Sequence, residues 1–393
     1  MTYRLTEEER ALRQTVRGFA ERELAPLVAD AEETGTFPRD TVLPSMAKLG
    51  LMSIGVPEAM GGVGGSSLML CLVAEEMARV CGGFAIGSMP SVLAPAALAA
   101  MQAPKQPDPM LLQALMQGAI MPALAFTEPG GGSDLAALGT VATPVPEGVR
   151  LDGSKAFISN APIADVFLIA AIHADFAGAS REERLRGFGV HVVPRGTPGL
   201  TIGKPLRKLG MRSSPTSELH LEGVLVPHGA PRIGGKQGRF GQMMRLIDFN
   251  RLYIAALSLG IAQAAFEHSL RYVQERCAFG RPIAEHQATG FKVARMSVEL
   301  DASRALLQRA CEAYDSGERS VLLISEAKLF ATEAAVRITT DAVQIHGGYG
   351  YVQDFPVERF FRDARVGTIW EGTSEIQQRV ICRELGMLGT TQS

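Results

Sequence analysis

The chain has 393 residues, 46% of them hydrophobic and 6% aromatic, which allows two or three domains with cores of their own. Its 39 basic and 41 acidic residues give a net charge of −2, which argues against nucleic acid or an anionic membrane as a partner. No stretch approaches the roughly 18 apolar residues that span a bilayer, so membrane insertion is not expected.

The cysteines are five, widely scattered, and form no Cys-x-x-Cys pair, which is typical of reduced, mostly structural thiols in a cytoplasmic protein. They are Cys71, Cys81, Cys277, Cys311 and Cys382. The polar stretch "MTYRLTEEER" does not resemble a signal peptide. The seven histidines form no His-Glu-x-x-His or comparable cluster, so no metal site is predicted.

The first region, residues 1–121, is predicted to be helical. Thr6 and Glu9 have the spacing of a capping box that precedes an apolar helical face. A loop is predicted at Pro57–Ser67, followed by another helix. The small, apolar tract Gly82–Ala103 contains two prolines, which argue against one unbroken helix there.

Residues 122–232 change to short apolar or alternating runs bounded by Gly, Pro, Asp and Ser. These runs are "VRLDGSKAFIS", "DVFLIAAI", "GFGVHVVP" and "SELHLEGVLVP". They predict an antiparallel sheet or a small barrel. The glycine-rich segment Gly229–Gly241 predicts the connection to the next region.

Residues 233–393 return to helix, with apolar side chains repeating every three or four positions over 252–273 and 323–345. Gly347 and Gly348 supply the expected helix stop. Long amphipathic helices with short connections predict a four-helix bundle. The predicted fold class is therefore α+β and mainly α, with a helical, a β and a second helical domain in that order.

The segment "IWEGTSEIQ" places an acidic residue, Glu371, just before a helix. Ser374 and Gln377 have capping-box spacing, so this helix is predicted to begin at Thr373 or Ser374. Glu371 then lies on the loop that enters the helix, where Gly372 lets a ligand approach the backbone closely. On these residues alone it is either a surface acid near a helix N-terminus or a catalytic carboxylate.

Two further motifs suit the oxygens of phosphate or flavin. "FTEPGGGSD", Phe126–Asp134, brings backbone N–H groups and hydroxyls together, although a plain glycine loop has the same pattern. "ERCAFGRPIAEHQ" carries Arg276 and Arg281 on a break between helices, either to grip phosphate or to end a helix in solvent. "QIHGGYGY" does not complete a dinucleotide fingerprint, and His346 within it is interpreted as a packing residue.

Taken together and in order, these motifs resemble the acyl-CoA dehydrogenase family over essentially the whole chain. The motifs that carry the resemblance are "TEPGGGSD", "SKAFISN", "ERCAFGRPIAEHQ", "QIHGGYGY" and "PVERFFRDARVGTIWEGTSEIQ". The resemblance implies FAD as cofactor, an acyl-CoA substrate and an electron-transferring flavoprotein as electron acceptor. It also implies a homotetramer, a dimer of dimers, in which each FAD reaches into a neighbouring subunit.

The resemblance makes Glu371 the base that removes the α-proton of the bound thioester, while the β-hydrogen leaves as hydride to flavin N5. The product is the trans-2-enoyl thioester, as in fatty-acid β-oxidation. A carboxylate held in a dry pocket has a raised pKa and is a better base. The substrate contacts implied by the family are Ser133, Asp248, Arg251, Trp370 and Gly372.

The cofactor contacts implied by the family come from all three regions of the chain. They are Leu124, Phe126, Thr127, Gly132, Ser133, Phe157, Ile158, Ser159, Arg276, Phe279, His286, Gln287, Gln344, Gly347, Gly348, Thr373 and Glu375. Phe157 and Ser159 stand where the family often has Trp and Thr, and Trp370 replaces the commoner Tyr. Some members carry the base on the helix that here offers Asn250, an amide that cannot act as a base.

The substrate and the electron acceptor are open at this point. Glutaryl-CoA members have an arginine where this chain has Ala85, and 80–104 contains no lysine or arginine, which favours an apolar acyl group. The alternatives are an acyl-CoA oxidase, a dehydrogenase of acyl groups on a carrier protein, and a non-redox lyase or CoA-ester-binding protein.

Overall fold

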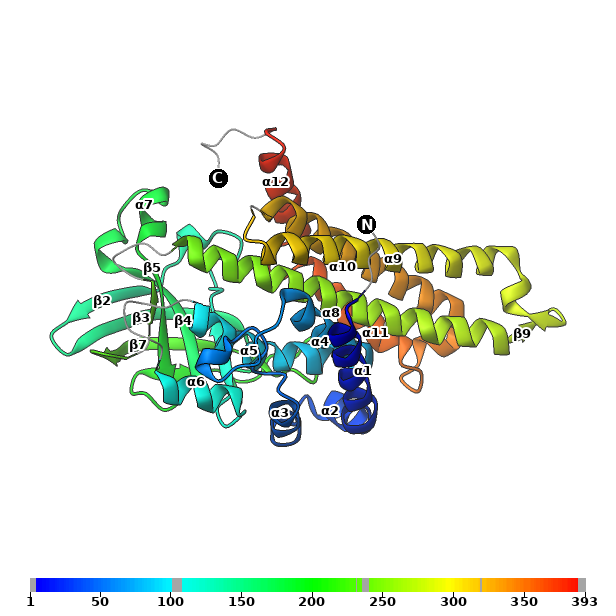
Figure 1. Cartoon of the computed structure of the whole chain (residues 1–393), viewed down its shortest axis with the longest axis horizontal. Coiled ribbons are helices and arrows are strands. Elements are labelled where there is room, and N and C mark those ends of the chain that lie inside the picture. The colour runs from blue at the N-terminus through cyan, green and yellow to red at the C-terminus, as the bar shows by residue number, and fades with distance from the viewer. Residues whose placement is uncertain (1–4, 101–107, 231, 235–239, 319, 388–393) are drawn as a thin grey trace.

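The computed structural model describes residues 5–100, 108–230, 232–234, 240–318 and 320–387. A curled β-sheet forms one end of the elongated molecule, and helices form the rest (Figure 1). The three predicted regions are therefore confirmed as helical, β and helical in chain order. The domain limits after residues 121 and 232 stay a prediction, and the connection Gly229–Gly241 lies partly outside the described residues.

The N-terminal region is built from six α-helices within the described residues. They are α1 (Glu7–Phe19), α2 (Val28–Thr34), α3 (Arg39–Lys48), α4 (Ser67–Val80), α5 (Gly82–Ala100) and α6 (Pro109–Met116). The capping box is confirmed, since the Thr6 hydroxyl accepts from the Glu9 N–H and the Glu9 carboxylate accepts from the Thr6 N–H. The predicted loop between α3 and α4 contains one short 3₁₀ turn, Glu58–Met60.

The prediction for the apolar tract was wrong, because α5 continues through both Pro90 and Pro95. Two carbonyls of α5 receive tertiary hydrogen bonds. The Tyr253 hydroxyl donates to the Ala85 carbonyl at 3.0 Å, and the Asn160 amide donates to the Gly87 carbonyl at 2.7 Å. Burial and these bonds outweigh the local preference of proline to break a helix. The helix is long and apolar enough to cross a membrane, but 89% of that window is buried inside the protein.

The middle region is a mixed sheet. Its strands are β1 (Pro122–Ala125), β2 (Val141–Val145), β3 (Gly148–Ser159), β4 (Val166–His173), β5 (Phe188–Pro194), β6 (Leu200–Ile202), β7 (Thr216–Pro227) and β8 (Arg232–Gly234). Their order is β6-β7-β3-β2-β4-β5-β8. Most pairs are antiparallel as predicted, but β4 pairs parallel with both β1 and β2. A short helix, α7 (Arg181–Arg186), lies between β4 and β5.

The C-terminal region is dominated by three long helices that lie side by side (Figure 1). They are α8 (Phe240–Glu275), α9 (Gln287–Asp315) and α10 (Val321–His346), and the shorter α11 (Val357–Ala364) and α12 (Ser374–Glu384) pack against α10. A hairpin of β9 (Cys277–Ala278) and β10 (Arg281–Pro282) joins α8 to α9. Helix α10 ends as predicted, with Gly347 at a positive φ of 59°.

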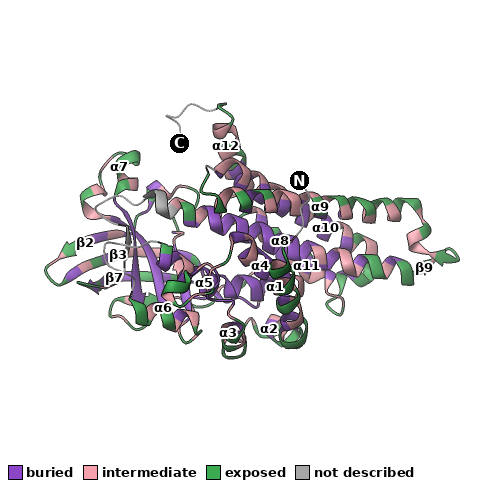
Figure 2. Cartoon of the chain, in the orientation of Figure 1, coloured by how far each residue is buried: buried purple, intermediate pink, exposed green. Residues whose placement is uncertain are grey.

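One hydrophobic core runs through both helical regions, with Phe84 of α5, Tyr253 of α8 and Ala335 of α10 all fully buried. Figure 2 shows this burial along α4, α5 and α8, while much of α9 is exposed. The start of α8 also contacts the sheet, because Leu246 packs in a second cluster with Leu168 of β4. Helix α8 therefore joins the β region to the helices that carry the candidate site.

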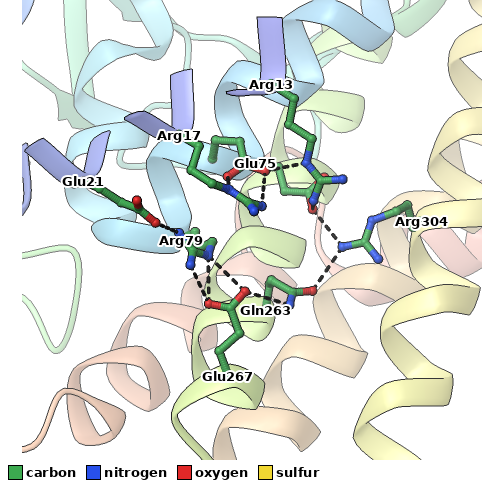
Figure 3. A network of polar contacts seen from close by, with 9 residues as sticks. Arg13, Arg17, Glu21, Glu75, Arg79, Gln263, Glu267 and Arg304 are labelled. Carbon is green, nitrogen blue, oxygen red and sulfur yellow. Dashed lines mark hydrogen bonds and ion pairs between the residues drawn. The ribbon is translucent and has the colours of Figure 1, made fainter. Parts of the chain in front are cut away.

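A network of ion pairs fastens the two helical regions together (Figure 3). Glu75 and Glu76 on α4 are almost fully buried. Arg13 of α1 donates to the Glu76 carboxylate at 2.6 Å. Arg17 donates to the same carboxylate through two of its nitrogens, at 2.8 and 2.9 Å. Arg304 of α9 donates to Glu75 at 2.8 Å. Because each buried carboxylate has guanidinium partners, the burial of charge is compensated.

Candidate active site

Glu371 lies on the loop between α11 and α12, and the start of α12 is set by Thr373. The Thr373 hydroxyl accepts a hydrogen bond from the Ile376 N–H at 3.3 Å, so α12 begins at Ser374 as predicted. Gln377 does not complete a capping box. Its buried amide instead donates to the carbonyls of Glu371 at 3.2 Å and Gly372 at 3.0 Å.

The backbone turns through the left-handed region at two successive residues of this loop. Glu371 has φ 50° and Gly372 has φ 89°. A non-glycine residue at positive φ is strained, so its surroundings must hold it there. A side chain at position 372 would also crowd Gln377, because a Cβ there would lie 2.6 Å from its Nε2 atom and Gln377 would have to move.

The Glu371 carboxylate is partly buried against the bundle helices. Nδ2 of Asn250, on α8, donates to Oε2 of Glu371 at 3.3 Å. Burial raises the pKa of Glu371 above its usual range, and the Asn250 hydrogen bond and the positive charge of Lys328 offset part of that rise. Lys328 of α10 donates to the carbonyls of Gly367 at 2.8 Å and Gly372 at 2.7 Å.

The predicted substrate residues on α8 lie one turn apart and form an ion pair. Arg251 donates to Asp248 at 2.8 Å, and both side chains are buried. Nε of Arg251, Nε1 of Trp370 and Oδ1 of Asn250 are buried polar atoms without a partner in the described part of the chain. These three atoms belong to residues that adjoin Glu371 in sequence, bond to it or act on its charge, so they are available to a polar ligand bound beside it.

The glycine loop of the β region is anchored by a buried ion pair that sequence reasoning missed. Lys155 of β3 donates to Glu128 at 2.6 Å, and Glu128 also accepts from Gly139 and Thr140. The Ala156 N–H donates to the Thr127 carbonyl at 2.9 Å. The three glycines and Ser133 that follow are exposed. A Cβ at Gly130 or at Gly131 would meet no atom within 4 Å, so the loop leaves open space above its backbone.

A β-bulge in β3 turns Phe157 out of the sheet. The register against β7 shifts between Lys155 and Ile158, and Phe157 adopts φ 58° with 68% of its side chain exposed. Ser159 returns to the ladder opposite Thr216. Ile158 is buried in the core of the sheet, so any ligand contact there comes from its backbone.

Of the remaining predicted cofactor residues, Thr373 and Glu375 lie at the start of α12 beside Glu371, and a further group lies at the hairpin between α8 and α9. The guanidinium of Arg276 lies 5.8 Å from the ring of Tyr349, which follows the Gly347–Gly348 turn. Phe279 has φ 52°, is 95% exposed and stacks edge-on with His286 at 5.8 Å. His346 is confirmed as a packing residue, since its ring stacks on Tyr272 at 4.2 Å.

These two groups of cofactor residues lie far apart in one chain. Asn250 of α8, which contacts Glu371, and Arg276, the residue that follows α8, are 26 positions apart, which is about 39 Å at 1.5 Å per residue of helix. Figure 1 shows the β9 hairpin at the end of the molecule opposite the sheet. The hairpin residues therefore lie well away from Glu371 within one chain.

The sequence matches three domains of one family in the observed order. The N-terminal domain of acyl-CoA dehydrogenases matches residues 6–115, the middle domain residues 123–224 and the C-terminal domain residues 238–386. The chain belongs to the acyl-CoA dehydrogenase family. It is an FAD-dependent oxidoreductase with the fold of that family.

Individual members of the family are similar along their whole length. A 3-(aryl)acrylate reductase of Clostridium sporogenes is 37% identical over 383 residues, which are 97% of this chain and 99% of that protein. The CarC subunit of the caffeyl-CoA reductase–Etf complex of Acetobacterium woodii is 36% identical over 378 residues, 96% and 97% of the two chains. The structure of butyryl-CoA dehydrogenase from Megasphaera elsdenii superposes with a TM-score of 0.91 at 32% identity, covering 98% of this chain and 100% of that one.

The residues present fit the cofactor of the family. Phe157 offers an exposed aromatic face, the exposed loop around Gly131 leaves open space above its backbone, and Arg276 offers a cation beside an open glycine turn. The supporting role of three residues had no signal in the sequence, although Lys155 and Gln377 lie within the motifs quoted above. Lys155, Lys328 and Gln377 are buried polar side chains whose role depends on contacts between distant segments.

Proposed function

We propose that this enzyme dehydrogenates an acyl-CoA thioester between Cα and Cβ, with Glu371 as the base that takes the α-proton. The observation that carries the proposal is the state of the Glu371 carboxylate. It is held on a left-handed loop, raised in pKa by burial, and contacted by Asn250 from α8. A carboxylate with a raised pKa is, in its ionised form, a stronger base than one in water.

The chain's own residues bind and orient the thioester. Asp248 and Arg251 hold the CoA moiety, together with Ser133 from the β region. Trp370 lines the acyl pocket, and its unpartnered Nε1 provides a donor there. The backbone N–H of Glu371 polarises the thioester carbonyl, which makes the α-proton more acidic. When bound, FAD supplies the chemistry that this chain lacks, acceptance of the β-hydrogen as a hydride at N5.

The acyl group that this chemistry suits is apolar. Helix α5 carries no lysine or arginine, and Ala85 within it is fully buried. An anionic tail placed there would be left without a cationic partner from this helix, which disfavours a dicarboxylate substrate.

The cofactor is shared between two subunits of a homotetramer. On one subunit, Thr127, Ser133, Phe157 and Ser159 hold the flavin and its phosphates. On the neighbour, Arg276, Phe279 and the Gly347–Gly348 turn hold the pyrophosphate and adenosine. The distance of about 39 Å from Asn250, beside Glu371, to Arg276, and the 95% exposure of Phe279, support this arrangement.

Electrons pass to an electron-transferring flavoprotein in the cytoplasm. Support comes from the CarC relative, whose name places it in a complex with Etf. The test of the acceptor is the oxygen dependence of turnover, because an acyl-CoA oxidase reoxidises its flavin directly with O₂. Turnover that needs only O₂ would replace the dehydrogenase assignment by the oxidase.

The decisive experiment is anaerobic bleaching of the flavin absorbance by straight, branched and aromatic acyl-CoAs. Glu371→Gln should slow bleaching by about 10² or more while leaving ligand binding nearly unchanged. Glu8→Gln, an exposed carboxylate at the start of α1, is the matched control. Retained bleaching in Glu371→Gln would overturn the assignment of the base. A yellow protein that no acyl-CoA reduces would favour a carrier-bound substrate or a non-redox role.

A further inference from the structure

Lys328 is a fully buried lysine at the middle of the candidate site. Its ammonium group donates to two carbonyls that flank the Glu371 loop, Gly367 at 2.8 Å and Gly372 at 2.7 Å. Within the described part of the chain, no carboxylate contacts Lys328 directly. The negative charge of Glu371 is the one that most favours the charged form of Lys328. A buried ammonium without a paired carboxylate is rare, because burying an unpaired charge is unfavourable.

We propose that Lys328 is the positioning residue of the base: it ties down both ends of the Glu371 loop and supplies the positive charge that keeps the Glu371 carboxylate ionised. The proposal rests on the proposed role of Glu371. Lys328 itself contacts the loop carbonyls and needs no contact with substrate, so it acts through Glu371.

The two carbonyls explain why a lysine stands at this position. Gly367 precedes the loop and Gly372 follows Glu371, so one group with several donors bridges both sides of the strained residue. Gln377 adds neutral hydrogen bonds to the Glu371 and Gly372 carbonyls. Gln377 therefore shares the task of holding the loop but brings no charge.

The effect of Lys328 on the ionisation of Glu371 follows from the charged and polar groups that face Glu371. The charge of Lys328 from α10 and that of Arg251 from α8 both favour the ionised carboxylate, and Asn250 adds a hydrogen bond. Around Lys328 itself, Glu333 of α10 and Glu375 of α12 act in the same direction as Glu371, while Arg251 opposes them. Burial lowers the pKa of Lys328 to about 8, so its charge is present at neutral pH and is lost as the pH rises through that value.

Two other buried lysines differ from Lys328 in their partners or in their position relative to the Glu371 loop. Lys155 is paired directly with Glu128 at 2.6 Å. Lys208 resembles Lys328 more closely, since it donates to the Ser214 carbonyl at 2.6 Å and burial lowers its pKa to about 8 as well. Lys208 lies away from the Glu371 loop, which makes it the matched control for a buried lysine whose loss should not affect the base.

The experiment measures the rate of anaerobic flavin reduction at saturating acyl-CoA over a pH range that brackets the pKa values of Lys328 and Glu371. Lys328→Met should lower the rate at neutral pH by about tenfold, part of the 10² to 10⁴ that a positioned general base supplies. The ascending limb of the pH–rate profile should move to higher pH, because the variant lacks the positive charge of Lys328 that favours the ionised form of Glu371. The wild-type inflection near pH 8 should disappear, while FAD content and affinity for a non-reducible acyl-CoA analogue stay near wild type.

Three variants make the outcome decisive. Lys208→Met should keep the wild-type rate and pH profile, and Lys328→Arg, which keeps the charge, should keep the ascending limb. Gln377→Leu removes only neutral hydrogen bonds, so it should lower the rate without moving the limb. If Lys328→Met does not retain FAD, Lys328→Gln takes its place, since it keeps a donor and removes the charge.

The proposal is overturned if the uncharged variants at position 328 show the wild-type ascending limb, or if Lys208→Met moves the limb equally. Glu371→Gln separates this result from the proposed function. An inactive Glu371→Gln together with a normal Lys328→Met removes only the role of Lys328. An active Glu371→Gln removes the assignment of the base itself.

Discussion

Replacing Lys155 by methionine should destabilise the β region and weaken the binding of FAD. Lys155 is fully buried and donates to Glu128 at 2.6 Å and to the Phe126 carbonyl at 3.3 Å. The change removes the charge partner of a carboxylate that is itself only 8% exposed. It also loosens the segment from Phe126 to Glu128, which leads into the open glycine loop.

The size of the stability loss depends on the hydrogen-bond donors that Glu128 retains in Lys155→Met. Removing one partner of a buried ion pair lowers stability by about 3–5 kcal/mol, because the other charge stays buried. Glu128 retains the N–H of Gly139 at 2.5 Å, and the N–H of Thr140 at 3.0 Å with its hydroxyl at 2.5 Å. Since these donors still compensate part of the charge, we expect about 3 kcal/mol, the lower end of that range.

The loss should depend on pH with a defined sign. Burial alone would raise the pKa of Glu128, but the charge and hydrogen bond of Lys155 outweigh it and hold that pKa below its usual range. A carboxylate with a lowered folded pKa stabilises the protein above its unfolded pKa of about 4.3, and this stability is lost as the pH falls through the folded pKa. Without Lys155 the folded pKa of Glu128 is higher than in the wild type, so the stability deficit of Lys155→Met should shrink as the pH falls through the range in which Glu128 is protonated.

The assay is urea unfolding of the FAD-loaded protein, combined with amide hydrogen exchange of residues 127–140 and titration of FAD. Adding Glu128→Gln to Lys155→Met should recover part of the loss, because it removes the unpaired charge, and the two single changes should not be additive. A loss below about 1 kcal/mol with unchanged FAD affinity would refute the reasoning. So would a double variant that is less stable by the full sum of the singles.

Three further changes test other parts of the structure. Glu76→Gln removes the charge that Arg13 and Arg17 share, and should lower the urea midpoint by an amount that corresponds to about 1–2 kcal/mol, because the arginines left behind are partly exposed, with little effect on the rate of flavin reduction. Gly372→Ala places a Cβ 2.6 Å from Gln377, and stopped-flow measurement should show slower flavin reduction with substrate affinity less affected. Asn250→Asp puts a second carboxylate at the 3.3 Å contact with Glu371, so the ascending limb of the pH–rate profile should move to higher pH.

The features that the sequence predicts well are those whose signal is local. The Thr6–Glu9 capping box, the four β runs and the glycine stop after His346 each depend on a few neighbouring residues, and all are found in the structure. The parallel pairing of β4 with β1 and β2 has no such signal, because it depends on which segments meet in space. Helix α5 fails the local rule for the same reason, since its prolines are tolerated within a buried environment.

The candidate site divides in the same way. Glu371 and the glycine loop are marked by unusual residues in short motifs, so their place could be predicted, although their roles came from the family resemblance. Lys155 and Lys328 could not be predicted, because a lysine within a helix or strand is normally exposed. Each becomes meaningful only when a segment 27 or 44 positions away supplies its partner.

Several of the predicted site residues have an unusual backbone conformation. Among the described residues, five that are not glycine have a positive φ, and Phe157, Phe279 and Glu371 are three of them. Each such conformation costs about 1–3 kcal/mol and persists only where the surroundings impose it. Glu371 gains hydrogen bonds within the chain, but the rings of Phe157 and Phe279 are 68% and 95% exposed and gain no burial from their strained backbones. Phe279 and Gly280 form the two-residue turn of the β9–β10 hairpin, where both residues take positive φ, and Phe157 stands at the bulge of β3. The hairpin and the bulge therefore impose these two conformations and leave both residues facing outward.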